Sequence, residues 1–208
     1  MQLSREPMKS NVELKARIDD RDAVIDVARR LGAVDMGEER QEDTYFSLGR
    51  YRLKLRESSN GEHWLIGYSR PDGPQARKSQ YRLTKVTDPD GTRFLMSKQW
   101  GVKVVVTKWR RVFLWQERVR IHVDKVETLG AFVEFEAMLS SASVDSSGAP
   151  SETPSGTPKC GDALAYDECA ALLDLARLRH DFGIAERDLI ATSYSTLVKQ
   201  SNQIPSGT

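Results

Sequence analysis

Charged and aliphatic residues alternate along several short segments of this chain, and this alternation limits its folds more than any other feature. In residues 11–18, NVELKARI, charged side chains occupy every second position at Glu13, Lys15 and Arg17. Successive side chains of a β-strand point to opposite faces, so the segment predicts a strand with one charged face and one aliphatic face. The same pattern returns in residues 51–57, 106–113, 120–124 and 132–138.

Helices with apolar stripes lie between and after these strands, and they decide where the charged faces point. We expect helices at residues 19–33, 92–101 and 162–183, and a short helical docking segment at 185–198. A solvated polar face explains any one strand taken alone, but the helices need apolar surface to pack on. Only the aliphatic strand faces supply it, so we expect the charged faces to meet inside a closed or nearly closed sheet.

Turn signals divide the rest of the chain into further strands, and neighbours are expected to pair antiparallel. Gly49 marks one turn, and the Asn60-Gly61 pair marks another. The predicted fold class is α+β, an antiparallel closed β-barrel of seven or eight strands with helices packed on the outside. The strands are expected at residues 11–18, 40–48, 51–58, 63–69, 77–86, 103–116, 118–126 and 131–139.

The 208 residues fit a single domain, which we place at residues 11–199 with tails at 1–10 and 200–208. Residues 140–161 are rich in Ser, Gly, Pro and Thr, which predicts a flexible insertion of low complexity. This insertion interrupts the domain before its last helices.

Bulk composition limits the partners of the protein. A formal net charge of +1 argues against a nucleic-acid or membrane-surface partner. Two cysteines without a framework spacing, together with no signal-like or membrane-spanning apolar run, predict a cytoplasmic protein. The oligomeric state stays open, with a homodimer as one option.

The expected interior holds more cations than carboxylates and therefore needs an anionic guest. Lys54 and Arg56 share one face, as do Lys108 and Arg110. Crowded cations repel one another and are costly to desolvate unless they are paired or hydrated. Phosphate oxygens match Arg and Lys, and carboxylates bind Mg²⁺ or Mn²⁺, so the pattern predicts a phosphoryl-transfer site. The carboxylates expected inside are Glu13, Asp124, Glu134 and Glu136.

At these residues the sequence resembles the CYTH family, or triphosphate tunnel metalloenzymes, which includes class IV adenylate cyclases, thiamine triphosphatases and inorganic triphosphatases. The family is marked by ExExK on its first strand, and Asn11-Val-Glu13-Leu-Lys15 stands in that place. LKLRE and TKWRR resemble its two basic strands, and IHVDKVETLGAFVEFE resembles its acidic closing segment. The resemblance runs from residue 11 to residue 139 and implies an eight-stranded antiparallel tunnel that binds a triphosphate-containing small molecule.

The resemblance also implies a role for individual residues. The ligands of one or two divalent metal ions, Mg²⁺ or Mn²⁺, would be Glu13, Asp124, Glu134 and Glu136. The catalytic residues would be Lys15, Arg56 and Glu136. The triphosphate would be held by Lys15, Arg17, Arg52, Lys54, Arg56, Lys108, Arg110 and Arg120, with Arg70 as a further candidate.

Two departures from the family pattern remove acid from the expected tunnel. Asn11 replaces the first glutamate of the motif and offers only a neutral amide oxygen. Ser79 and Tyr81 stand where many members carry glutamates. The sequence therefore does not decide whether the site holds one metal ion or two.

Three functions remain open at this stage. The leading prediction is a metal-dependent phosphohydrolase that acts on inorganic triphosphate, a nucleoside triphosphate or thiamine triphosphate. The second is a class IV-type adenylate cyclase that forms cyclic AMP from ATP, for which Trp64, Tyr68 and Trp109 are candidate base-stacking residues. The third is a polyphosphate- or nucleotide-binding module with little catalysis, because Asn11 weakens the metal site.

Overall fold

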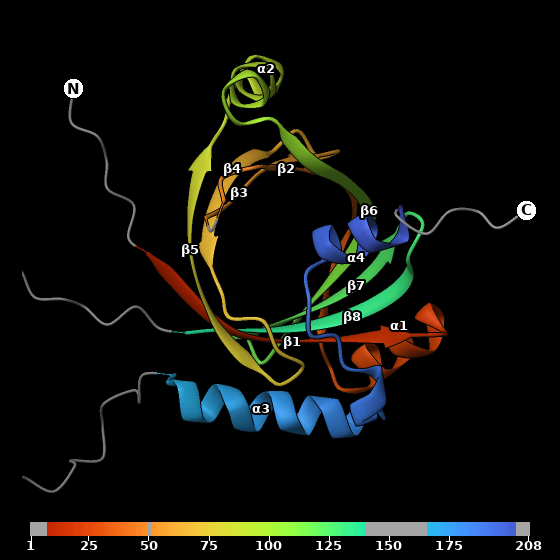
Figure 1. The fold of residues 1–208 in the computed structure, drawn as a ribbon. Coiled ribbons are helices and arrows are strands. Elements are labelled where there is room, and N and C mark those ends of the chain that lie inside the picture. The colour runs from red at the N-terminus through yellow and green to blue at the C-terminus, as the bar shows by residue number, and fades with distance from the viewer. Residues whose placement is uncertain (1–7, 50, 140–165, 203–208) are drawn as a thin grey trace, which may run out of the picture.

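The computed structural model describes residues 8–49, 51–139 and 166–202, in which eight antiparallel strands form a closed barrel with helices outside it (Figure 1). This architecture confirms the predicted fold class. The insertion predicted at 140–161 lies outside the described residues. The strands are β1 (Lys9–Ile18), β2 (Val34–Phe46), β3 (Arg52–Ser58), β4 (His63–Ser69), β5 (Arg77–Lys85), β6 (Val102–Trp115), β7 (Val119–Val126) and β8 (Gly130–Met138). The helices are α1 (Arg21–Arg30), α2 (Pro89–Trp100), α3 (Glu168–Asp181), the 3₁₀ turn η1 (Glu186–Asp188) and α4 (Tyr194–Ser201).

The barrel closes through β1, which pairs with β5 on one side and with β8 on the other. The order around the ring is β1-β5-β4-β3-β2-β6-β7-β8. Residues that stand opposite each other in a ladder share a face of the sheet. The β1–β8 register places Glu13 opposite Glu136 and Lys15 opposite Glu134, so the charged faces of the two strands form one inner wall.

The aliphatic faces of β1, β7 and β8 lie on the outside of the barrel, beneath α1 and α3 (Figure 1). Leu14 and Phe135 belong to the same buried core as Ala28 of α1 and Leu175 of α3. Helix α1 begins after Asp20, whose carboxylate accepts hydrogen bonds from the first backbone amides of the helix. The prediction that aliphatic faces point outward under helices is thus confirmed for these strands.

Helix α4 packs into one end of the barrel beside β6 (Figure 1). Its buried residues Tyr194 and Val198 contact Tyr45, Val106 and Phe132, which point inward from three different strands. The inner surface is therefore apolar at this end and polar beyond it. The docking segment expected at 185–198 is helical only in two separate parts, η1 and α4, and α4 covers the apolar end.

Two elements begin three or more residues earlier than the sequence predicted. Strand β2 starts at Val34 rather than at residue 40, and its exposed first part carries a bulge, where Gly37 has a φ of 94° and the pairing with β6 shifts register. Helix α2 starts at Pro89 rather than at residue 92. Asp88 caps it by accepting a hydrogen bond from the Gly91 amide, and proline suits the first helical turn.

Candidate functional site

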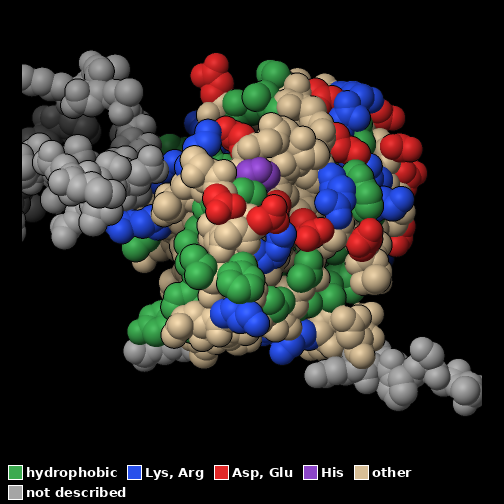
Figure 2. All heavy atoms as spheres, turned by 90° about the horizontal axis from the view of Figure 1, so that it is seen from above, with side chains coloured by type: hydrophobic (Ala, Val, Ile, Leu, Met, Phe, Trp, Pro, Cys, Tyr) green, Lys and Arg blue, Asp and Glu red, His purple; other side chains and the backbone are tan. Residues whose placement is uncertain are grey.

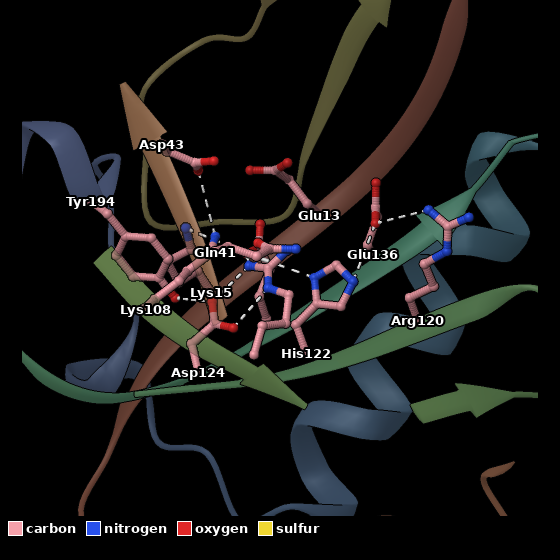
Figure 3. A network of polar contacts seen from close by, with 12 residues as sticks. Glu13, Lys15, Gln41, Asp43, Lys108, Arg120, His122, Asp124, Glu136 and Tyr194 are labelled. Atoms are coloured by element: carbon pink, nitrogen blue, oxygen red, sulfur yellow. Dashed lines mark hydrogen bonds and ion pairs between the residues drawn. The ribbon is translucent and has the colours of Figure 1, made fainter. Parts of the chain in front are cut away.

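A cavity of about 450 Å³ occupies the interior of the barrel and is lined by side chains from all eight strands. Most of the predicted site residues lie on its wall, and Figure 3 shows part of this arrangement. The predicted residues that line it are Glu13, Lys15, Lys54, Arg56, Lys108, Arg110, Arg120, Glu134 and Glu136. The alternation seen in the sequence thus brings charges from distant segments into one enclosed space.

Three predicted residues lie outside this lining. Asp124 is fully buried behind Arg110, whose guanidinium donates to its two carboxylate oxygens at 2.7 and 2.6 Å. Arg17 is exposed and donates to a backbone carbonyl between β7 and β8 at 2.7 Å. Arg52 forms an ion pair with Asp72 at 2.9 Å. In this arrangement Asp124 acts on the cavity through Arg110. Arg17 and Arg52 have partners away from the cavity.

Asp43 on β2 is the main charged residue of the site that the sequence analysis missed. Its carboxylate, 1% exposed, accepts hydrogen bonds from Lys54 at 2.7 Å and from Arg56 at 2.7 and 2.9 Å, and Lys108 Nζ lies 3.7 Å away. Burial alone would raise the pKa of Asp43, but these three cations hold it well below its usual range. Asp43 shares the inward parity of Tyr45, so the alternation along β2 could have located it.

The lysines of this cluster lose their protons more easily than ordinary lysines. Burial, together with the charge of Arg56, lowers the pKa of Lys54 to about 8. Burial and the charge of Arg110 lower the pKa of Lys108 well below its usual value. The positive charge contributed by Lys54 and Lys108 therefore depends on pH, and Lys54 loses its proton near pH 8.

Arg110 connects the buried Asp124 to Glu134 on the cavity wall. Its Nη2 lies 3.0 Å from Glu134 Oε2, and Lys15 Nζ lies 3.6 Å from the same oxygen. Burial would raise the pKa of Glu134, but Lys15 and Arg110 bring it well below its ordinary value. Tyr194 of α4 donates its hydroxyl to Asp124 at 2.9 Å, and the Lys15 ammonium lies 3.7 Å from the centre of its ring. The C-terminal helix therefore helps to position the cations at this end of the cavity.

Glu13 is paired with Arg70, the further candidate that follows β4. The two side chains form a buried ion pair, and both line the cavity. Burial raises the pKa of Glu13, and the nearby charge of Glu134 acts in the same direction against the opposing charges of Arg70 and Lys15. The pKa values of Glu13 and Glu134 are thus shifted in opposite directions.

Glu136 is part of a polar group with Arg120 and His122 (Figure 3), and Asn11 also belongs to this group. Asn11 donates its amide to Glu136, and Arg120 Nη1 lies 3.6 Å from the carboxylate. His122 lies between the two glutamates of β8, with Nε2 3.6 Å from Glu136 and Nδ1 3.9 Å from Glu134. Burial lowers the pKa of His122, which favours the neutral ring. The buried atoms Asn11 Oδ1 and His122 Nδ1 have no hydrogen-bond partner within the described part of the chain.

The interior is closer to charge balance than the sequence analysis expected. Asp43 compensates the basic residues of β3, and Arg70 adds a cation beside Glu13. Buried charges persist when they are paired and hydrogen-bonded, which explains how the cavity holds so many of them. An anion that enters must therefore take cations away from carboxylates that already bind them.

The donor set on β1 and β8 suits a divalent cation. Glu13, Glu134 and Glu136 supply carboxylate oxygens, and the unpartnered oxygen of Asn11 is a neutral oxygen donor on the same wall. Mg²⁺ and Mn²⁺ prefer such oxygen ligands. In the residues that the structure describes, no three His, Cys, Asp or Glu side chains already converge as a metal site. The basic side chains hold the carboxylates instead, so a metal would bind by exchanging partners with them.

The fold and the site together define an antiparallel tunnel with an ionised interior. The chain belongs to the CYTH domain family, whose domain matches residues 9–148, more than half of its length. This match confirms the resemblance drawn from the motifs. Both departures from the family pattern, Asn11 on β1 and the pair Ser79 and Tyr81 on β5, lie on the cavity wall.

Individual proteins are similar to this chain in sequence or in fold. The chain is 29% identical over 139 residues to a protein of Methanocaldococcus jannaschii provisionally named an adenylate cyclase, with 62% of this chain and 77% of the relative covered. A Pyrococcus horikoshii protein has the same fold, with a TM-score of 0.71 and 22% identity, covering 90% of this chain and 98% of its own. A Hippeastrum protein, provisionally named an adenylyl cyclase and described as having a dominant triphosphatase activity, has a TM-score of 0.59 and 11% identity, covering 95% and 98%.

The outer surface bears on the expected partners. On the face drawn in Figure 2, acidic and basic side chains are interspersed, without a broad field of one sign. Within residues 8–49, 51–139 and 166–202, no helix is both long and apolar enough to cross a membrane. The absence of a nucleic-acid partner stays a prediction.

Proposed function

We propose that this protein is a metal-dependent phosphohydrolase that acts on a triphosphate-containing small molecule held inside the barrel. The observation that carries the proposal is that two walls of the cavity face each other. The cationic wall carries Lys54, Arg56 and Lys108, and the acidic wall on β1 and β8 carries Glu13, Glu134 and Glu136. Lys54 and Arg56 on β3 lie across the barrel from Glu134 and Glu136, because β3 and β8 are opposite each other in the ring. The cavity of about 450 Å³ has the size of a small-molecule site, roughly 300–1,000 Å³.

Binding would proceed by an exchange of ion pairs. Phosphate oxygens would replace Asp43 and Glu134 beside Lys54, Arg56 and Arg110, because Arg and Lys bind phosphate as they bind carboxylate. The released carboxylates would then be buried without partners, at a cost of several kcal/mol each. Mg²⁺ or Mn²⁺, held by the acidic wall, would neutralise this charge and that of the phosphates.

The proposed reaction is an attack of water on the terminal phosphorus. A bond forms from the water oxygen to phosphorus, the bond from phosphorus to the bridging oxygen breaks, and orthophosphate is released. Glu136 is proposed to orient the water and accept its proton, because its cation contact, to Arg120 at 3.6 Å, is long and partly exposed. Lys15 and Arg56 would stabilise negative charge on the transferring and leaving groups.

A class IV-type adenylate cyclase is the second candidate function. Trp64, Tyr68 and Tyr81 line the cavity on β4 and β5, where their rings could stack on an adenine base. The name of the Methanocaldococcus relative favours the same activity. In this reaction the ribose 3′-hydroxyl attacks the α-phosphorus and diphosphate leaves. Trp109, the other aromatic candidate, lies outside the cavity lining.

A product assay separates the functions. The purified protein is incubated with tripolyphosphate, ATP or thiamine triphosphate, each with Mg²⁺ or Mn²⁺, and the products are identified. Orthophosphate release from any of the three supports the hydrolase. Cyclic AMP together with diphosphate from ATP would make the protein a cyclase instead. Tight binding without turnover of any substrate would overturn both enzymes and leave a binding module.

A matched pair of variants connects the activity to the site. We expect Glu134→Gln to abolish metal-dependent turnover, because it removes a proposed metal ligand at nearly constant volume. The control is Glu127→Gln, an exposed residue in the turn between β7 and β8, which should keep full activity. Activity that survives in Glu134→Gln would contradict the site assignment.

A further inference from the structure

Two buried polar atoms on the acidic wall have no partner, and both point to a missing ligand. Asn11 is 3% exposed and His122 is 6% exposed, yet Asn11 Oδ1 and His122 Nδ1 make no hydrogen bond within the described residues. Buried polar atoms are nearly always paired, so an orphaned pair in one group needs a physical explanation. The charged side chains of the cavity give neither atom a hydrogen bond.

The position of His122 leaves room for a metal ion beside its ring. Nε2 lies 3.6 Å from Glu136, and Nδ1 lies 3.9 Å from Glu134 (Figure 3). Both separations exceed a hydrogen bond of roughly 2.7–3.2 Å. A metal ion shared by a nitrogen and a carboxylate oxygen holds the two atoms farther apart than a hydrogen bond does, because each lies roughly 2.0–2.2 Å from the ion.

The two flanking glutamates also suit the second requirement of a metal-bound histidine. Such a ring binds the metal through one nitrogen and usually donates the N–H of the other to a carboxylate, which fixes its orientation. His122 has one carboxylate beside each nitrogen. One glutamate can therefore share the metal with the ring while the other accepts its N–H. Asn11, already bonded to Glu136, brings its free amide oxygen to the same group.

We propose that His122 is a nitrogen ligand of the metal ion in this tunnel, and that it makes the site select Mn²⁺ over Mg²⁺. The inference rests on the proposed function, because it concerns the metal of the same site. Both ions bind oxygen ligands, but Mn²⁺, as a transition-metal ion, also accepts an imidazole nitrogen, which Mg²⁺ disfavours. With Asn11 supplying only a neutral oxygen, the nitrogen strengthens the binding of Mn²⁺ without adding negative charge.

The direct test is pulsed electron paramagnetic resonance of bound Mn²⁺, which detects a ligand nitrogen by its coupling to the metal. Tag-free protein is measured with Mn²⁺ alone and with Mn²⁺ plus a methylene-bridged, non-hydrolysable triphosphate analogue. We expect a ¹⁴N coupling in the wild type, replaced by a ¹⁵N coupling after selective labelling of histidine. The coupling should disappear in His122→Ala and in His122→Gln.

The chain provides its own controls, because it contains three histidines. His63→Ala and His180→Ala remove the other two and should keep the coupling. Titration calorimetry should show that His122→Gln loses at least about tenfold in Mn²⁺ affinity and much less in Mg²⁺ affinity. Circular dichroism verifies that the variants remain folded.

The outcomes separate this inference from the proposed function. Bound Mn²⁺ without nitrogen coupling in the wild type, or coupling that persists in both His122 variants, would overturn the inference. Orthophosphate release in that case would leave the hydrolase intact. Nitrogen coupling in a protein that turns over no triphosphate would support the ligand and refute the hydrolase. Failure of Mn²⁺ to bind with or without the analogue would overturn the inference, and orthophosphate release with Mg²⁺ would then decide on the hydrolase separately.

Discussion

Asp43 is the single residue that balances the charge of the cationic wall. It is the counter-ion that Lys54, Arg56 and Lys108 share, and it is almost completely buried. Replacing it with a neutral residue of the same shape would leave these cations facing one another. In such a variant, an entering phosphate would neutralise the three cations that Asp43 neutralises in the wild type.

We therefore expect Asp43→Asn to lower the free energy of unfolding at neutral pH by about 3 kcal/mol, because the partners of a broken buried ion pair stay uncompensated. Tripolyphosphate should raise the melting temperature of this variant more than that of the wild type. Thermal unfolding in EDTA, with and without tripolyphosphate, measures the effect. Asp72→Asn, at an exposed ion pair, is the control and should change stability by about 0.5 kcal/mol or less. Equal stabilisation of Asp43→Asn and wild type by tripolyphosphate would contradict this role.

Lys54 predicts a pH dependence of the reaction. Its pKa is lowered to about 8 by burial and by the charge of Arg56, so it is charged below that pH and neutral above it. The charged form binds phosphate, and kcat/KM reports the ionisation of the free enzyme. We expect kcat/KM for tripolyphosphate to fall as the pH rises through about 8.

Lys54→Arg tests this assignment, because arginine stays charged throughout that range. The fall in kcat/KM should move to higher pH in the variant. Lys78→Arg, at an exposed ion pair on β5, is the matched control and should keep the wild-type profile. An unchanged midpoint in Lys54→Arg would show that another group governs the profile.

Among the strands, the inward face could be predicted wherever charged and aliphatic residues alternate regularly. This is the case in β1, β3, β6, β7 and β8. Strand β2 was read less well, because its exposed and bulged start obscures the alternation that places Asp43 inside. Arg17 and Arg52 share the parity of the site residues but lie outside the cavity lining. Parity predicts the face of a strand, whereas the position along the barrel axis depends on strand register.

The docking of α4 could be expected only in outline. Its site is the apolar end of the barrel, formed by Tyr45, Val106 and Phe132 from three strands. No local sequence pattern joins these residues, so the place where the helix inserts depends on the completed barrel. The contact of Tyr194 with Asp124 and Lys15 depends on that insertion.

Variants of Tyr194 test the contribution of α4. Tyr194→Phe removes the hydrogen bond to Asp124 and should cost about 1–2 kcal/mol in the free energy of unfolding. Tyr194→Ala also removes a buried ring and should cost about 3–5 kcal/mol. Urea unfolding gives both values, with Leu173→Ala on the exposed side of α3 as a control near zero. Equal costs for the two Tyr194 variants would contradict the packing of this ring in the barrel.

At the scale of the whole molecule, a barrel with paired interior charges predicts that metal and triphosphate bind together. The phosphates take the cations and the metal takes the carboxylates, so each ligand relieves the charge that the other exposes. Such coupling is reciprocal, and it usually amounts to roughly 5–150-fold in affinity. Each ligand alone is therefore expected to bind more weakly than it does in the presence of the other.

We expect Mn²⁺ to raise the affinity for a non-hydrolysable triphosphate analogue by about tenfold or more, and the analogue to raise the affinity for Mn²⁺ by the same factor. Calorimetric titration in both orders measures the coupling. Ca²⁺, a larger cation that favours more ligands, provides a comparison. Independent binding of the two ligands would contradict the exchange of ion pairs.

The central claim is that the acidic wall supports attack of water on the terminal phosphorus of a bound triphosphate. The most direct measurement is the rate of orthophosphate release from tripolyphosphate in ¹⁸O-labelled water with Mn²⁺, for the wild type and Glu134→Gln. We expect each released orthophosphate to carry a single ¹⁸O atom from water. We also expect the rate of release to fall at least about 100-fold in Glu134→Gln. No release by the wild type, or an equal rate in Glu134→Gln, would contradict it.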